Sequence, residues 1–487
     1  MKSSLKATSD PLRTRSQLLL VTVGSSPGSP TGVLAAADRH VGGAIARAIK
    51  DGEVRGKAGE ATLFHAGETA GPRRIAVVGV GAGSAREDWQ SAGQSFAKTV
   101  AKARATSVSV ALPDGIEADH AAALIEGIWL GDYRFERFKG GENGGGSRIA
   151  QLVVTGRGIT AAQLARTAVV MERTAAARDL GNTPANHLDP QMLADYAKTL
   201  AAGMPGLTCR VLGTRDLERL GAGALLAVGQ GSAVPPRMIV LRWKPAKARR
   251  GEVLGLVGKA VTFDTGGISI KPSAGMEEMK LDMSGGAVTL EGIAAIAQLG
   301  LPIETLAVIP VAENMPSGTA IKPGDVVTAM NGKTIEVVNT DAEGRLILAD
   351  GLTYAARNGA TRIVEFATLT GAMVVALGEV YAGLFGSDAD WTESVRAAAE
   401  SSGDLAWPMP LHEGYRPLIA SSVADLSNAA KKRQAGAVYA AMFLREFTEG
   451  VPWCHLDIAG TAMAGGASSG YGLRLIARLA EELAAAS

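Results

Sequence analysis

Two acidic side chains, Asp341 and Glu343, lie two residues apart in the segment 337–346, where we predict a strand that leads into a helix. On an extended backbone, residues two apart point to the same face, so both carboxylates would project together. Two carboxylates held side by side repel each other unless a cation lies between them. Their hard oxygen atoms suit Zn²⁺, Mn²⁺ or Mg²⁺. A lone pair of this kind is better explained as a helix cap, with Asp341 capping the helix and Glu343 facing its dipole.

A second cluster surrounds a predicted apolar strand that ends at Lys259. A charged side chain in that position is costly to bury unless it has a partner. Asp264 follows, and the paired glycines at 266–267 would let the chain fold back. We therefore expect Lys271 to lie near Asp264.

A third cluster contains Asp282, which lies just before a helix that we predict to begin near Ala287. Taken singly, each cluster could be an ordinary surface salt bridge or a helix cap. The glycine pairs at 266–267 and 285–286 could also cradle a phosphate, but neither has the spacing of a P-loop. The acids and lysines are harder to dismiss when taken together, and two ions bound there could lower the pKa of a bridging water and stabilise an oxyanion.

The elements that must position these residues alternate between strands and helices, which predicts an α/β fold. We expect a smaller N-terminal α/β domain, residues 1–165, and a larger C-terminal α/β catalytic domain, residues 166–487, with a mixed sheet flanked by helices. A glycine-rich stretch at 139–147 is predicted to be flexible. Strands are predicted at 17–23, 74–80, 107–112, 149–155, 237–241, 253–258, 303–310, 334–338 and 362–367. Helices are predicted at 41–51, 88–103, 121–130, 160–179, 287–298 and 345–357.

The composition is that of an ordinary globular protein and excludes several classes of function. The chain has 487 residues, so we expect two domains. Its net charge of +1 indicates neither a nucleic-acid-binding surface nor a strongly charged membrane-binding surface. Its only cysteines, Cys209 and Cys454, are too few for a disulfide framework or a cysteine-rich zinc site. No signal peptide or membrane-length apolar run is evident, so we expect a soluble, cytoplasmic protein. The basic triplet at 431–433 is interpreted as a solvated loop.

Several of these stretches closely resemble the leucine aminopeptidase (cytosol aminopeptidase) family. The segment 339–346 reads NTDAEGRL and matches the signature octapeptide of that family without substitution, and 257–272 resembles its metal-and-lysine loop. The resemblance covers roughly residues 165–487. It is looser at 435–437 and 466–472, where the local shape of the pocket could differ. Further matching segments are 407–411, 424–428 and 455–460.

The resemblance implies a homohexamer that acts on peptides, with two divalent ions (Mn or Zn) in each subunit. It implies that Lys271 stays charged and polarises the scissile carbonyl, and that Arg345 holds a bicarbonate ion or a water as general base. The implied metal ligands are Lys259 in its neutral form, Asp264, Asp282, Asp341 and Glu343. The implied pocket for the first, leucine-like side chain is formed by Met279, Thr368 and Gly371, although core packing explains Met279 equally well.

Two alternatives remain open from the sequence. The first is another two-metal hydrolase, such as a phosphoesterase. Such sites often recruit histidines, and none of the six histidines lies beside the acidic clusters. We interpret His455 as a buried histidine with a hydrogen-bond partner. The second is a DNA-binding or scaffold role in addition to the peptidase activity, and the nearly balanced charge argues against it.

Overall fold

The structure is a computed structural model that describes all residues except 7–9, 68–70, 141–148, 248–250, 431–433 and 486–487. It divides into two compact units, residues 1–172 and 173–487, and the division falls within the long helix α5 (Ala161–Asn182). Most of the glycine-rich stretch predicted to be flexible, and all of the basic triplet, lie outside the described residues. Within the described part, no helix combines the length and apolar composition that crossing a membrane requires.

The first unit is built on a six-stranded sheet in the order β1-β6-β5-β2-β4-β3, parallel except for β3. Helices α3 and α4 pack closely because each contributes a glycine where the other's backbone passes. A Cβ on Gly93 would lie 2.1 Å from the carbonyl oxygen of Leu124. The strands are β1 (Lys2–Lys6), β2 (Leu18–Val23), β3 (Ala61–His65), β4 (Arg74–Gly79), β5 (Ser107–Ala111) and β6 (Gln151–Thr155). The helices before α5 are α1 (Gly32–His40), α2 (Ala44–Lys50), α3 (Arg86–Ala103) and α4 (Ala118–Asp132).

The second unit is built on a nine-stranded mixed sheet in the order β16-β15-β18-β14-β9-β11-β8-β7, with β10 paired to β11. The central strands β18, β14, β9 and β11 run parallel. β15 pairs antiparallel with β18 and parallel with β16, and β8 pairs antiparallel with both β11 and β7. The strands are β7 (Leu207–Leu212), β8 (Arg237–Trp243), β9 (Val253–Gly258), β10 (Ala260–Asp264), β11 (Glu304–Asn314), β14 (Arg362–Ala367), β15 (Ala382–Gly386), β16 (Ala406–Pro408) and β18 (Trp453–Asp457). Smaller sheets contain β12 (Val326–Thr328), β13 (Thr334–Glu336) and β17 (Leu426–Ser427), and β19 (Met463–Ala464) with β20 (Ala467–Ser468).

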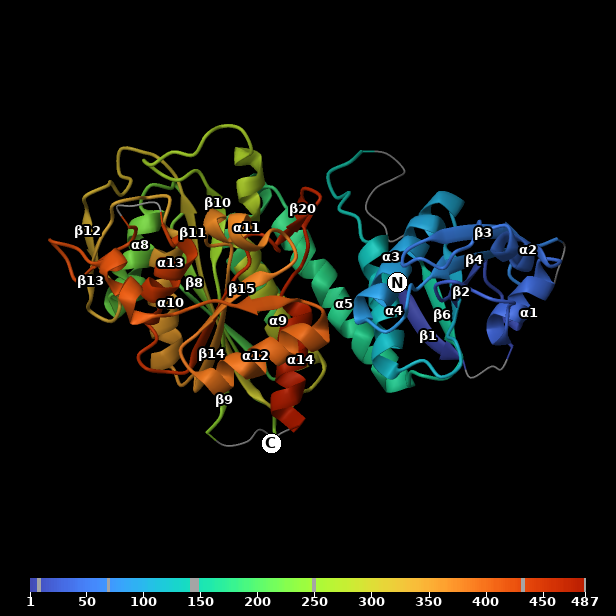
Figure 1. Ribbon diagram of the computed structural model, residues 1–487. Helices are drawn as coiled ribbons and strands as arrows, with labels where there is room; N and C mark the ends of the chain where they lie inside the picture. Colours follow the sequence, from blue (N-terminus) through green and yellow to red (C-terminus); the bar gives the residue numbers. More distant parts are fainter. Residues whose placement is uncertain (7–9, 68–70, 141–148, 248–250, 431–433, 486–487) are drawn as a thin grey trace. The chain divides into compact units, whose positions relative to one another are not determined.

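Helices cover both faces of this sheet, as Figure 1 shows: α9, α12 and α14 pack on one face, and α8, α10 and α13 on the other. Strands buried on both faces are nearly all apolar, which explains the unbroken apolar run of β9 and the largely apolar sequence of β14, where the buried Glu365 interrupts the run. The two α/β units confirm the predicted fold class. The helices of this unit are α6 (Pro190–Ala202), α7 (Thr214–Leu220), α8 (Gly223–Gly229), α9 (Ser284–Gln298), α10 (Gly344–Arg357), α11 (Gly371–Leu377), α12 (Ala389–Ser402), α13 (Gly436–Arg445) and α14 (Leu473–Ala485).

The register of the central parallel strands places three chain segments at one edge of the sheet. Gly258, at the end of β9, lies opposite Phe366 of β14, and Ala367 of β14 lies opposite Asp457 of β18. The residues that follow these strand ends therefore meet at the carboxyl edge, where α/β sheets place their ligands.

Candidate active site

Lys259 lies at the junction of β9 and β10 and is only 3% exposed. Its Nζ lies 2.8 Å from Oδ1 and 2.7 Å from Oδ2 of Asp282, and 3.0 Å from Oε1 of Glu343. It also donates to the carbonyl oxygen of Thr368 at 2.9 Å. A Cβ on Gly344 would lie 2.5 Å from Lys259 Cε, so the glycine of the NTDAEGRL segment makes room for the lysine stem. The buried ammonium is thus surrounded by acceptors that offset its desolvation.

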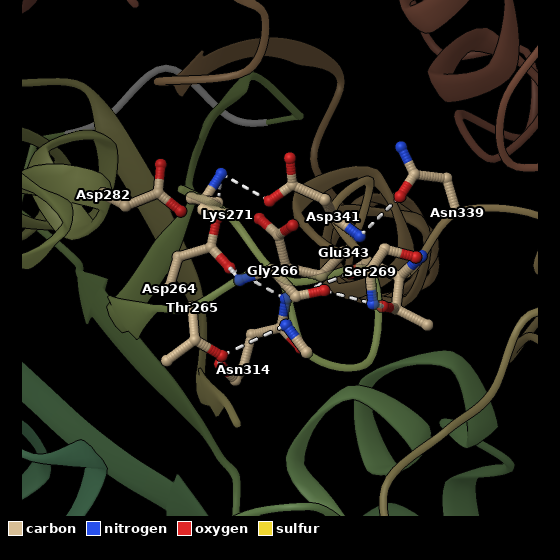
Figure 2. A network of polar contacts seen from close by, with 12 residues as sticks. Asp264, Thr265, Gly266, Ser269, Lys271, Asp282, Asn314, Asn339, Asp341 and Glu343 are labelled. Carbon is tan, nitrogen blue, oxygen red and sulfur yellow. Dashed lines mark hydrogen bonds and ion pairs between the residues drawn. The ribbon is translucent and has the colours of Figure 1, made fainter. Parts of the chain in front are cut away.

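Lys271 forms the second cationic centre of the site. Its Nζ lies 2.9 Å from Asp264 Oδ2 and forms an ion pair with Asp341. Figure 2 shows Asp264, Asp341 and Glu343 directed toward the same small volume, with the Lys271 ammonium beside them. Carboxylate oxygens of these three acids lie within 4.8 Å of one another.

The chain returns from Asp264 to Lys271 through two glycines in the left-handed region. Gly266 has φ 85° and Gly267 has φ 68°, values that side chains with a Cβ rarely adopt. The Gly266 N–H donates to Asp264 Oδ1 at 2.9 Å, and the Lys271 N–H donates to the Thr265 carbonyl at 2.9 Å. The turn predicted from the paired glycines therefore closes by backbone hydrogen bonds and places Lys271 beside Asp264.

The route of the chain to Asp341 and Glu343 differs from the predicted one. β13 ends at Glu336 instead of 338, and Glu343 has helical angles, φ −71° and ψ −36°. The extended backbone predicted through this acidic pair was therefore wrong, and a turn brings the two carboxylates together. The helix-cap alternative does not hold either, because the N-cap of α10 is Glu343 and its side chain makes no cap hydrogen bond.

Asn314 is a functional candidate that the sequence analysis missed. It ends the long apolar strand β11 and is 1% exposed. Its Nδ2 donates to Asp264 Oδ1 at 2.8 Å and to the carbonyl oxygen of Thr340 at 3.0 Å. Thr340 in turn donates through Oγ1 to the carbonyl oxygen of Gly266 at 2.6 Å. The available signal was a pair of polar residues, Glu313 and Asn314, directly after the apolar run in the middle of the strand.

The pKa values of the site reflect burial set against close pairing. Burial lowers the pKa of Lys259, but Asp282, Glu343 and Asp264 raise it by more, so the ammonium form is favoured. The pKa of Lys271 is raised for the same reasons, mainly by Asp264 against the effect of burial. Burial raises the pKa of Asp264 to about 6, with Glu343 adding to the shift. Four carboxylates thus face two ammonium groups, which leaves an excess of negative charge.

The donor set fits hard divalent cations. Oxygen atoms dominate it, and one of them, Glu343 Oε2, is buried with no hydrogen-bond partner among the described residues. An unpaired carboxylate oxygen in such a place is costly, and a cation would offset that cost. The convergence of Asp264, Asp341 and Glu343 provides the geometry for one.

A cavity of about 280 Å³ opens over these groups. Nine of the ten residues predicted for the site line it; only Arg345 does not. The predicted residues that line it are Lys259, Asp264, Lys271, Met279, Asp282, Asp341, Glu343, Thr368 and Gly371. The lining residues that the sequence analysis did not single out are Glu278, Leu281, Leu369, Thr370, Val374, Ala459, Ala462 and Met463.

Arg345 is buried on the first turn of α10 and does not line the cavity. It donates through Nη1 to the carbonyl oxygen of Asn428 at 2.5 Å, and its guanidinium lies 5.1 Å from the ring centroid of Tyr439. His455 is also fully buried; its Nδ1 lies 3.1 Å from Glu365 Oε1. It does not line the cavity.

Comparison with known proteins identifies both units. The model of the cytosol aminopeptidase family catalytic domain matches residues 175–477, and that of the N-terminal domain of the same family matches residues 20–142. A probable cytosol aminopeptidase of Solibacter usitatus is 47% identical over 441 residues, which cover 88% of this chain and 91% of the relative. A probable cytosol aminopeptidase of an Acidovorax species is 42% identical over 444 residues, covering 90% and 88%.

Solved structures show the same similarity. A mutant of tomato leucine aminopeptidase superposes with a TM-score of 0.90 at 32% identity, covering 99% of this chain and 96% of that one. The bottromycin maturation enzyme BotP in complex with Mn superposes with a TM-score of 0.84 at 33% identity, covering 96% and 100%.

Proposed function

The chain belongs to the cytosol aminopeptidase family, and we propose that this metal-dependent aminopeptidase releases N-terminal residues, preferentially leucine-like ones, with water activated by two divalent ions. The observation that supports the two-metal proposal best is the convergence of the buried Asp264 and Glu343 and the half-buried Asp341 on one cavity. Phosphoester hydrolysis is not proposed, because both family models and the relatives are peptidases. A DNA-binding role is not proposed either, because the charge is nearly balanced.

The residues that would hold the ions are the four carboxylates together with Lys259. Lys259 would have to lose its proton, since a metal ligand needs a free lone pair. Two divalent ions, Mn²⁺ or Zn²⁺, would supply the positive charge needed to balance the four carboxylates, which the two ammonium groups balance only in part. When bound, such ions lower the pKa of a bridging water and stabilise a developing oxyanion. The proposed ligands are Lys259, Asp264, Asp282, Asp341 and Glu343.

Lys271 is proposed to act on the substrate carbonyl. Its side chain is 22% exposed, in contrast to 3% for Lys259, so it is the lysine that reaches the cavity opening. Its raised pKa keeps it charged. A fixed positive charge at this position would stabilise the oxyanion as it forms. Arg345 is proposed to hold a bicarbonate ion or a water; its buried Nε, which has no hydrogen-bond partner in the described part, is the donor available for that role.

The cavity wall is proposed to select the first side chain of the substrate. Met279, Thr368 and Gly371 line it together with Val374 and Met463, so most of this wall is apolar. Gly371 leaves open space where a side chain would otherwise stand, since a Cβ there would meet nothing within 4 Å. A branched apolar side chain such as that of leucine suits such a wall.

We also propose that the protein forms a homohexamer and is located in the cytoplasm. The resemblance implies a homohexamer, which size-exclusion chromatography with light scattering would measure. The relatives are described as cytosol aminopeptidases, which supports a cytoplasmic location.

The free α-amino group of the substrate provides the decisive test. If one ion binds that amine, leucine amide is cleaved and N-acetyl-leucine amide is not, because acetylation removes the lone pair. Activity on leucine amide should also fall at acid pH, where the substrate amine is protonated. The measurement is the rate on both compounds across a pH series, with a phosphate ester as control substrate. Comparable cleavage of the acetylated compound would refute the aminopeptidase assignment.

A further inference from the structure

Asp457, the last residue of β18, is fully buried, and its carboxylate is surrounded by donors. Oδ1 accepts from the N–H groups of Leu369 at 3.2 Å, Thr370 at 3.4 Å and Ala459 at 3.2 Å. Oδ2 accepts from Thr370 Oγ1 at 2.6 Å. Within the described part of the chain no cation pairs with it. Asp457 is therefore a buried carboxyl group whose hydrogen-bond donors are all neutral, and burying such a polar group is costly without a compensating role.

The segment that this carboxylate holds cannot complete its own hydrogen bonds. β14 ends at Ala367, opposite Asp457 in the parallel ladder, and the chain then leaves the sheet. The N–H groups of Leu369 and Thr370 lie beyond that ladder and need other acceptors. Asp457 supplies both, so the carboxylate on one strand end fixes the loop that follows its neighbour.

The fixed loop contacts the proposed metal site directly. Thr368 precedes the held residues, and its carbonyl oxygen accepts from Lys259 Nζ at 2.9 Å. Its Oγ1 donates to Asp282 Oδ1 at 2.8 Å. Thr368 thus contacts two of the proposed ligands, and it is attached to the residues that Asp457 holds.

The same loop also begins a wall of the cavity. Thr370 Oγ1, while donating to Asp457, accepts from the N–H of Met373 at 3.3 Å and so caps α11. Gly371 and Val374 of α11 line the cavity. The Asp457 carboxylate therefore holds two features of the site: Thr368, which contacts the proposed metal ligands, and the start of α11, which lines the cavity.

We propose that Asp457 is a positioning residue of the reaction, which acts by holding Thr368 against Lys259 and Asp282. This inference rests on the proposed two-metal function. A carboxylate suits the role better than an amide, because it accepts all four donors without offering one. Asparagine would keep the shape, but its NH₂ group would face donors, and the loop would shift. A displacement of about 1 Å can cost about 10²-fold in rate.

The test compares Asp457→Asn with a matched change elsewhere in the same unit. Asp350, on α10, is equally buried and also accepts backbone N–H groups, from Leu225 at 2.8 Å and Met330 at 2.7 Å, but does not line the cavity. Asp350→Asn therefore makes the same chemical change away from the site. We expect both variants to unfold at lower temperature. Only Asp457→Asn should lower kcat on leucine amide, about 10–10²-fold, and reduce the Mn²⁺ retained after dialysis.

Equal loss of kcat in the two variants, or unchanged kcat and Mn²⁺ content in Asp457→Asn, would overturn the proposal. If Asp457→Asn does not fold, Thr370→Val removes the 2.6 Å bond to the carboxylate and is compared with Thr353→Val, whose buried hydroxyl donates to the Ala349 carbonyl. A decrease of kcat and Mn²⁺ content in Thr370→Val alone supports the inference, and no difference refutes it. An unmodified enzyme that binds Mn²⁺ but does not cleave leucine amide would refute the proposed function, and the Mn²⁺ measurement would still decide the role of Asp457.

Discussion

Each unit has a cavity at the carboxyl end of the parallel strands of its sheet. The two cavities differ strongly in the number of charged side chains that line them. In the first unit a cavity of about 480 Å³ lies at the ends of β2 and β5, and it is larger than the cavity of about 280 Å³ over the lysines and carboxylates of the second unit. Its lining consists mostly of small and apolar residues, and its one carboxylate, Asp114, is exposed. The smaller cavity contains two lysines and several buried carboxylates. Buried charged side chains therefore indicate which cavity is the candidate active site, whereas the volume of a cavity alone does not.

The difference has a physical reason. Water stabilises the ionised groups of an exposed loop, whereas a buried carboxylate loses that hydration. In the second unit several carboxylates are buried close together. Each acid is paired with Lys259 or Lys271, which offsets the lost hydration. A charge arrangement with so large a desolvation cost is typical of a site that binds ions or performs catalysis.

Removal of metal should have the largest effect. Treatment with a strong chelator should abolish turnover of leucine amide, and Mn²⁺ or Zn²⁺ should restore it, because activated water is lost with the ions. The measurement is activity alongside metal content by elemental analysis. Full activity in a preparation verified as metal-free would show that the charges of the second cavity serve another purpose.

Loss of the exposed lysine should come next. Lys271→Ala should lower kcat by about 10²–10³-fold with a smaller change in KM, the scale of losing one oxyanion donor. Steady-state kinetics on leucine amide measure both constants, and Lys322→Ala, at an exposed ion pair with Asp325, is the control. A variant in which only KM changes would remove Lys271 from the chemical step.

Loss of Asn314 should act mainly through stability. Asn314→Ala leaves Asp264 Oδ1 and the Thr340 carbonyl without the donor that joins them, and each lost partner in a buried place costs about 1–3 kcal/mol. Urea unfolding measures the change. The control is Asn358→Ala, because Asn358 is exposed at the C-terminal end of α10 and its side-chain amide donates to the carbonyl oxygen of Tyr354 in the last turn. An equal, small effect in both variants would mean that Asn314 does not support the site.

The local parts of this site could be predicted from the sequence. Mostly apolar segments predicted β9 and β14 with their observed bounds, because strands buried on both faces consist largely of apolar residues. The paired glycines at 266–267 predicted the turn, because few other residues adopt positive φ. The NTDAEGRL segment identified the family, which both family models confirm.

The contacts between distant segments could not be predicted in the same way. Asn314 lies 50 residues from Asp264, and Asp457 lies 88 residues from Leu369, so only the sheet order brings each pair together. The pattern of residues within one segment does not indicate the order of the strands in the sheet. Polar N-terminal residues also concealed β1, whose partner β6 follows about 150 residues later. The sequence pattern did not predict α1 or β3 either.

The smallest effect should come from the cavity of the first unit. Thr31 is the N-cap of α1, is exposed, and makes no side-chain cap hydrogen bond, so Thr31→Ala should cost less than the roughly 1 kcal/mol usual for such a cap. Asp114→Asn removes the one carboxylate of this cavity, which is exposed to solvent. Because no buried charge is disturbed, we expect both variants to keep kcat/KM on leucine amide within about twofold and the free energy of unfolding within about 0.5 kcal/mol. The measurements are steady-state kinetics and urea unfolding, with Lys271→Ala as the positive control. A tenfold loss of kcat/KM at unchanged stability would mean that the larger cavity is coupled to the reaction, and that buried charge is not what separates the two cavities.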